Sequence, residues 1–249
     1  MAFRFTYEAL DVHEEKFGLC LQTPIDAMAD RVHLQELYNR ASEDWPVLFD
    51  ELHQSEGQVQ FTKTVRIPGK GQFKAATFST TPRGIGFDFP HRQPLHQDEI
   101  PWPSTLNANV LAFLDVFTHC FPTQRIVSVG KMRMLVFQYG PENPTEWLRE
   151  RFAAGCPAGL KSVQIKWNQG DERYVRLVDV SAVSQLGAAP SPTGFGFRRS
   201  PTGKWGIQVV LDVRSMHVPK GIKTEEIGII LDHADAVFAT DLLPALNGE

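Results

Sequence analysis

A short phrase that occurs twice constrains the fold of this chain more than any single residue does. Residues 82–87 read PRGIGF and residues 192–197 read PTGFGF, so the second copy follows the first by nearly half of the 249 residues. Three shorter matches keep the same order along the chain: Asp44-Trp45 with Glu146-Trp147, Val59-Gln60-Phe61 with Val163-Gln164-Ile165, and Val116-Phe117 with Val237-Phe238. Self-similarity at such a period predicts two related structural units.

Hydrophobic periodicity predicts the same order of elements in both halves: a strand, a helix, a run of antiparallel strands and a second helix. Apolar and polar residues alternate in residues 58–67, which is typical of a strand with one solvated face. Apolar residues recur at helical spacing in residues 105–121. The other elements expected in the first half are a hairpin or one bent strand at 3–22, a helix at 30–53 interrupted at Pro46, strands at 73–80 and 84–89, and a loop at 91–104.

The second half is expected to begin with a strand at 125–139 and a helix that starts after Asn143, where an Asn-Pro-Thr-Glu run has the pattern of a helix start. The elements expected after it are strands near 163–167 and 175–184, a loop at 186–193, a hairpin at 194–214 with its turn at 200–203, and a helix from Thr224. The chain is therefore predicted to be α+β, with two tandem modules of strand, helix, antiparallel sheet and helix. We assign them to residues 1–122 and 123–249, each sheet covered on one face by helices, with an extra strand in the second.

Composition excludes several classes of function. The formal net charge is −4 and the lysines and arginines are scattered, which argues against binding to nucleic acid or to a membrane surface. The three cysteines, Cys20, Cys120 and Cys156, are far apart and form no Cys-x-x-Cys pair, so neither a disulfide framework nor a zinc ribbon is expected. No secretory signal is recognisable at the N-terminus. A cytoplasmic protein without a cofactor is the resulting expectation.

Few residues form a pattern that suggests chemistry. The glycines of the repeated phrase are interpreted as packing positions within strands, because no helix follows them as a dinucleotide-binding motif requires. The densest set of metal-ligand types is His91, His96, Asp98 and Glu99, but they lack a metal-binding spacing, and solvated side chains in a loop are the favoured interpretation.

Two other groups are interpreted as structural. His119 and Cys120 are adjacent on a helix and cannot face each other, so a catalytic pair is not expected. Asp232 and Asp235 can share one side of the last helix, which is interpreted as a solvated face. No catalytic constellation emerges from these residues.

The favoured binding residues are Arg198, Arg199, Lys204 and Trp205, which flank the expected turn at 200–203. Arginine and tryptophan are enriched where proteins bind one another. The sequence therefore favours a non-enzymatic protein-interaction or assembly module, such as an accessory subunit of a larger complex, with a protein partner or self-association. The alternative is a small-ligand-binding protein or a hydrolase, with His91, His96 or Cys120 lining a pocket between sheet and helix.

Three segments carry a family resemblance: FLDVFTHCFPTQRIVSVGKMRMLVF, GIQVVLDVRSM and LDHADAVFATDLLPAL. They resemble a sporadically distributed bacterial family of similar length and unknown function, over about a third of the chain. The N-terminal strand departs from the pattern of that family. The resemblance implies a fold expectation and no catalytic residue.

Overall fold

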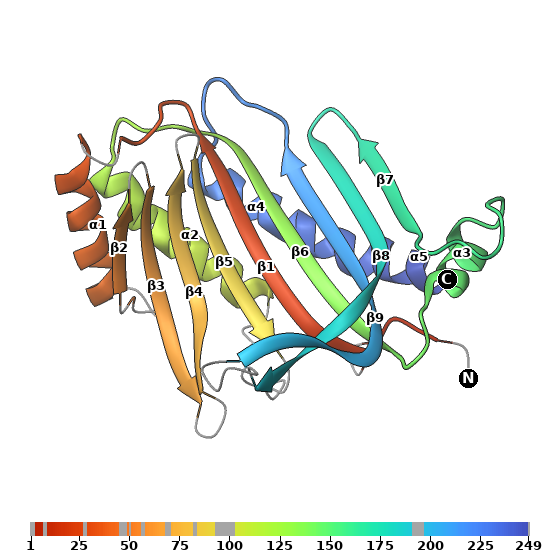
Figure 1. The fold of residues 1–249 in the computed structure, drawn as a ribbon. Coiled ribbons are helices and arrows are strands. Elements are labelled where there is room, and N and C mark those ends of the chain that lie inside the picture. Colours follow the sequence, from red (N-terminus) through yellow and green to blue (C-terminus); the bar gives the residue numbers. More distant parts are fainter. Residues whose placement is uncertain are drawn as a thin grey trace.

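The computed structural model describes residues 3–6, 9–26, 29–44, 49, 51–55, 58–67, 71–81, 84–92, 103–190 and 197–248. Its strands form one antiparallel sheet in the order β2-β3-β4-β5-β1-β6-β9-β8-β7 (Figure 1). The strands are β1 Leu10–Leu21, β2 Glu51–Ser55, β3 Gln58–Ile67, β4 Gly71–Thr81, β5 Gly84–Arg92, β6 Ile126–Gly140, β7 Gln164–Gly170, β8 Tyr174–Pro190 and β9 Phe197–Ser215. The helices are α1 Arg31–Asp44, α2 Pro103–Cys120, α3 Thr145–Phe152, α4 Thr224–Ala236, the π-helical η3 Val237–Leu242 and α5 Leu243–Asn247.

The predicted α+β class is confirmed, but the prediction of two separate sheets is wrong. β1 and β6 lie side by side in the middle and pair antiparallel, so the strands of both halves join in one sheet. Within the described ranges, residues 1–122 contribute five strands and residues 123–249 contribute four, which does not match the extra strand expected in the second half. The division of the chain into two domains stays a prediction.

The long helices α2 and α4 cover the same face of the sheet, and α1 lies at its β2 end (Figure 1). Successive side chains of a strand point to opposite faces of the sheet, so every second apolar residue packs against these helices. In β6, for example, Val129, Leu135 and Phe137 are buried against them. We call the other side of the sheet, to which β6 sends Met132 and Met134, the open face. None of the helices in the described part of the chain is long and apolar enough to cross a membrane.

The apolar side chains between sheet and helices form two clusters. The first gathers residues of α1, α2 and the start of α4 over β1 to β5, and includes Phe61, Phe78 and Phe113. The second gathers the end of α4, η3 and α5 over β6 to β9, and includes Leu148 and Val209. The seam between the two clusters runs across the central strands β1 and β6.

Three local predictions are wrong for identifiable reasons. The loop expected at 186–193 is part of β8 as far as Pro190, because these residues pair with β9, and residues 191–193 lie outside the described ranges. The helix expected at 30–53 ends at Asp44, and residues 51–55 pair with β3 as the edge strand β2. The hairpin expected at 194–214 is one strand, β9, because its partner β8 extends to Pro190 and pairs with it along its length. Gly203 has φ +74° near a register shift in this ladder, so the turn-like residues 200–203 produce an irregularity within a strand.

Candidate functional site

The most distinctive chemistry is a set of charged and polar side chains buried between the two apolar clusters. Glu15 comes from β1, Lys131 and Arg133 from β6, Asn107 from α2 and Asp235 from α4. We call these five residues the charge cluster. The side chains of Glu15, Lys131 and Arg133 are at most 5% exposed, and that of Asp235 is 19% exposed.

Two cations and two carboxylates compensate one another in the charge cluster. Lys131 Nζ lies 2.6 Å from Asp235 Oδ1 and 3.5 Å from Glu15 Oε2, and it donates a hydrogen bond of 2.9 Å to Asn107 Oδ1. Arg133 Nε donates to Glu15 Oε1 at 2.6 Å, and Arg133 Nη2 donates to Asp235. Such pairing is what makes buried charge tolerable, since an uncompensated ion in the interior is costly.

Burial dominates the electrostatics of Lys131. It lowers the pKa of the ammonium below the usual lysine value, and the neighbouring Glu15 and Asp235 only partly oppose this shift. The ammonium also lies 5.0 Å from the ring centroid of Phe17, and the guanidinium of Arg133 lies 5.0 Å from that of Phe238. The ammonium and the guanidinium are therefore enclosed between apolar clusters. Their hydrogen bonds to Asn107 and Asp235 connect the sheet to α2 and α4.

The prediction that Asp232 and Asp235 form a solvated helix face is wrong for Asp235. Asn107 Nδ2 donates to Asp232 Oδ1 at 2.9 Å and to Asp235 Oδ2 at 2.8 Å, so α2 and α4 are joined through these carboxylates. Asp232 itself is exposed. A signal was present in the sequence: Lys131 and Arg133 interrupt the apolar alternation of β6 on the side that carries Val129 and Leu135.

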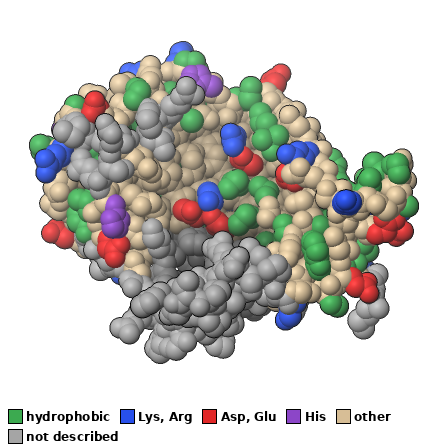
Figure 2. All heavy atoms as spheres, viewed as in Figure 1, with side chains coloured by type: hydrophobic (Ala, Val, Ile, Leu, Met, Phe, Trp, Pro, Cys, Tyr) green, Lys and Arg blue, Asp and Glu red, His purple; other side chains and the backbone are tan. Residues whose placement is uncertain are grey.

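The open face has a different character. Figure 2 shows it from the same side as Figure 1, with a hollow over its middle where backbone and uncharged polar side chains predominate. Four apolar side chains lie beside one another on β6, β9 and β8: Met134 stands opposite Val210, and Met132 and Leu177 flank Asp212 in one row. Leu177 is 37% exposed, and the other three are half-buried.

An arginine is fixed next to these apolar residues. Arg214 Nε lies 2.9 Å from each carboxylate oxygen of Asp212, and Arg214 Nη2 donates to the same carboxylate. The side chain of Asp212 is 10% exposed and that of Arg214 is 60% exposed. The hydrogen bond to Asp212 raises the pKa of Arg214 above the usual arginine value. A buried carboxylate therefore anchors an accessible guanidinium on the open face.

Glycines line up across the open face beside this arginine. Gly18 pairs with Gly86 of β5 on one side and with Gly130 of β6 on the other. A Cβ on Gly130 would lie 3.0 Å from Cγ of Arg214, so this glycine leaves room for the arginine stem. A Cβ on Gly84 would lie 2.1 Å from the backbone oxygen of Leu19 in β1, so the close approach of these two strands requires this glycine, whereas a Cβ on Gly86 would make only ordinary contacts at 3.6 Å. A Cβ on Gly18 would meet nothing within 4 Å, so packing does not explain that glycine.

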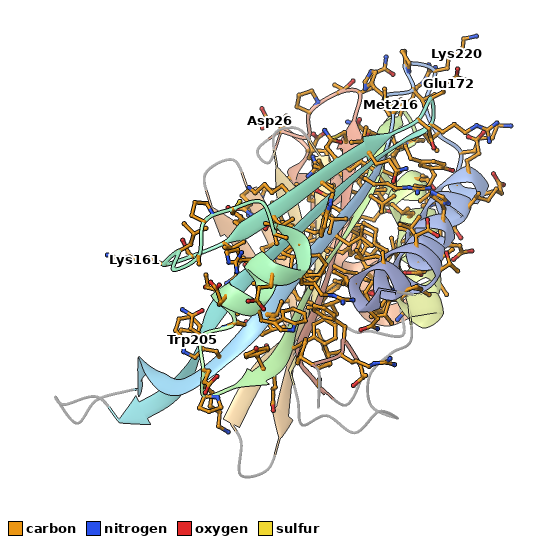
Figure 3. All side chains as sticks on the ribbon, turned by 90° about the vertical axis from the view of Figure 1, so that its right-hand side faces the viewer. Asp26, Lys161, Glu172, Trp205, Met216 and Lys220 are labelled. Carbon is orange, nitrogen blue, oxygen red and sulfur yellow. The ribbon has the colours of Figure 1, made fainter. Side chains whose placement is uncertain are left out.

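The structure does not gather the four expected binding residues at a hairpin tip. Arg198 and Arg199 pair with Ala189 and Ala188 in the β8–β9 ladder. Lys204 is exposed and Trp205 is half-buried farther along the same strand. Figure 3 places Trp205 at the end of the sheet away from Glu172 and Met216.

The proposed metal ligands are mostly outside the described residues. His91 lies in β5 opposite His13, whereas His96, Asp98 and Glu99 belong to a segment that the structure does not describe. In the described ranges, no group of three or more His, Cys, Asp or Glu side chains is arranged to hold a metal ion.

The cysteine thiols show no nucleophilic arrangement among the residues described. Burial raises the pKa of the Cys120 thiol, which favours its protonated form, while the adjacent His119 is exposed. Cys20 and Cys156 are exposed free thiols. Comparison of the sequence with protein-family models and with curated proteins gives no match.

Proposed function

We propose that this chain is a non-enzymatic interaction module that binds another protein on its open face. The observation that carries the proposal is the anchored Arg214 beside the apolar side chains of Met132, Met134, Val210 and Leu177. Asp212 already fixes the side chain of Arg214, so this arginine would lose little conformational entropy when a partner accepts its hydrogen bonds. Arginine next to apolar surface is typical of residues that dominate binding energy.

The surrounding residues support the same proposal. Methionine side chains adapt their shape to a partner and are common on binding surfaces. A glycine inside a strand costs stability, and one that packing does not require is consistent with a partner that approaches the backbone closely, here at Gly18. Lys16, held by Glu14 at 2.7 Å and by Asp88 at 3.3 Å, adds fixed charge of both signs next to the glycines. These charges would set the orientation of the partner.

We further propose that the two halves derive from a duplicated unit. Each half runs through a strand, a helix, a series of antiparallel strands and a helix, from β1 to α2 and from β6 to α4. The first strands of the halves are neighbours in the sheet and antiparallel, which is the arrangement expected of two units related by a pseudo-twofold axis. This proposal predicts that the helices α2 and α4 superpose when β1 is laid on β6.

The binding proposal is tested by capturing partners from a lysate of the source organism with the tagged protein and its variants. Arg214→Ala and Met134→Asp alter the open face, and Ile229→Asp alters an apolar side chain that is 63% exposed on α4, on the other side of the molecule. We expect a captured protein, once purified, to bind Arg214→Ala about 30-fold more weakly, which corresponds to a hot-spot loss of about 2 kcal/mol.

Ile229→Asp should bind as the unaltered protein does, because α4 faces away from the open face. A partner that binds all variants equally would place the interface elsewhere. Failure of the tagged protein to retain any partner would argue against the interaction function itself.

A further inference from the structure

The outer edge of β7 is a second surface that could bind another protein chain, because β7 is the last strand of the sheet. β7 ends the sheet, and within the described residues only β8 pairs with it. Six of its seven residues are exposed, and Ile165 is half-buried. Figure 3 views the molecule from this side. About half of the backbone N–H and C=O groups of an edge strand point outward, ready to pair with another strand.

This edge lacks most of the features by which proteins prevent association between sheets. Such features are prolines, bulges, very short strands, covering helices and charged side chains. β7 has no proline, and its register with β8 is continuous from Gln164 to Gly170. The opposite edge strand, β2, has only five residues, and α1 lies at that end of the sheet (Figure 1).

The single charged residue of β7 does not protect the edge. Lys166 Nζ lies 3.5 Å from Asp179 Oδ2 on β8, so this side chain is directed back over the sheet. Gln164 also donates to Asp179, at 2.6 Å. On the helix side, Trp167 contacts Phe152 of α3 edge to face, with ring centroids 5.8 Å apart, and remains 40% exposed. Among the side chains of β7 itself, a strand laid along this edge would meet an apolar indole and a lysine already paired with Asp179, and α3 lies beside the Gln164 end of the strand (Figure 1).

We propose that two copies of this chain pair through β7, antiparallel, with Trp167 opposite Trp167 of the partner subunit. A second copy fits because an antiparallel edge is self-complementary: a twofold axis perpendicular to the sheet matches each outward donor with an acceptor. The same axis keeps the helices of both copies on one side of the joined sheet. This proposal concerns a surface separate from the open face and does not depend on the proposed binding function.

Charge and packing select this register from its neighbours. Residues that pair must share a face of the sheet, so the register changes in steps of two. Shifting one step places Lys166 opposite its own copy, which brings like charges together. Shifting the other way separates the two tryptophans and places each opposite Gln169. The central register pairs Trp167 with its copy and places each Lys166 opposite the neutral Asn168 of the other chain.

A charge change at Asn168 tests the proposal without altering the core, since Asn168 is exposed. Light scattering over a concentration series should give twice the 28.0 kDa of one chain for the unaltered protein. Asn168→Lys places two lysines opposite the two copies of Lys166 and should weaken the dimer about 2- to 10-fold. Asn168→Glu should strengthen it by a similar factor. Ile229→Lys, which adds the same charge on α4, should leave the dimer unchanged.

The register is tested by cross-linking in a Cys20→Ser and Cys156→Ser background, which removes the exposed thiols. Trp167→Cys should give a disulfide-linked dimer on mild oxidation, because directly opposed residues bring their Cβ atoms within disulfide range. Lys166→Cys should cross-link at least ten times more slowly. A monomer at every concentration, a dimer indifferent to both changes at Asn168, polydisperse aggregates, or a monomer that pairs β7 with a peptide of another protein would each overturn the proposal.

Discussion

At the scale of single residues, the charge cluster places buried ionic and polar side chains between the two apolar clusters. Glu15 and Asp235 each contact both Lys131 and Arg133, so neither carboxylate belongs to one partner alone. Removal of one carboxylate would leave two buried cations with a single counterion. Breaking a buried pair from one side costs more than the pair itself contributes, because the remaining charge is uncompensated.

The first prediction concerns Glu15, which is fully buried. Glu15→Gln should lower the free energy of unfolding by about 3 kcal/mol, measured by urea denaturation. The control is Asp232→Asn, which changes an exposed carboxylate that accepts a hydrogen bond from Asn107 and should cost less than about 1 kcal/mol. Equal effects of the two substitutions would mean that the charge cluster is not enclosed.

At the scale of elements, the contact between β8 and α4 contains a titratable group. His233 of α4 stacks on Tyr174 of β8, with ring centroids 4.3 Å apart, and its Nε2 lies 3.2 Å from Nη2 of Arg176. Burial and the nearby Arg176 lower the pKa of His233 below its usual value, against the opposing charges of Asp171 and Asp241. The contact is therefore formed with a neutral imidazole at neutral pH.

The second prediction follows from the sign of that shift. As the pH falls below 6.5, the unfolded chain binds a proton at His233 before the folded chain does, so the contribution of this residue to stability is lost. His233→Phe keeps the ring stack and removes the titration. Between pH 7.5 and pH 5, the melting temperature of the unaltered protein should therefore fall more than that of the variant, in parallel thermal melts. A constant difference between the two proteins would contradict the lowered pKa.

The third prediction concerns the ladder between β1 and β5. Gly84→Ala places a methyl group against the backbone oxygen of Leu19 and should lower the free energy of unfolding by about 1–3 kcal/mol. Gly18→Ala, two positions from Gly84's partner Cys20 in β1, meets open space and should leave stability unchanged or raise it by up to about 1 kcal/mol. Urea denaturation of both variants measures the two free energies of unfolding that are compared. A Gly84→Ala protein as stable as Gly18→Ala would mean that the two strands can separate locally.

Local patterns in the sequence were sufficient to predict most helices and strands. They were insufficient to predict the contacts between elements that are far apart in the chain. The strict alternation of residues 58–67 and the helical spacing of residues 105–121 correspond to β3 and α2, because each pattern reflects one buried face. The turn-like residues 200–203 were misleading, since only the partner strand β8 shows that the chain continues straight there. Asp235 was misjudged because its partners Lys131 and Arg133 lie about a hundred residues away. The interrupted alternation of β6 indicates buried cations, but it does not identify the carboxylates that pair with them.

At the scale of the whole molecule, the two halves of the chain are joined by strand pairing and by buried ion pairs. β1 from the first half and β6 from the second pair along the length of β1, from Leu10 to Leu21. Glu15 and Asn107 of the first half meet Lys131, Arg133 and Asp235 of the second in the charge cluster. Separation of the halves would expose the edges of both central strands and leave these ions without their partners.

The fourth prediction is that residues 1–122 and 123–249 unfold together. Urea denaturation followed by far-ultraviolet circular dichroism and by hydrogen exchange of peptides from β3 and from β8 should give one midpoint, because loss of either half removes the central pairing of the other. Glu15→Gln, although it lies in the first half, should lower the midpoint in β8 as much as in β3. Two separate transitions, or an effect of Glu15→Gln confined to β3, would mean that the continuous sheet contains two independently stable domains.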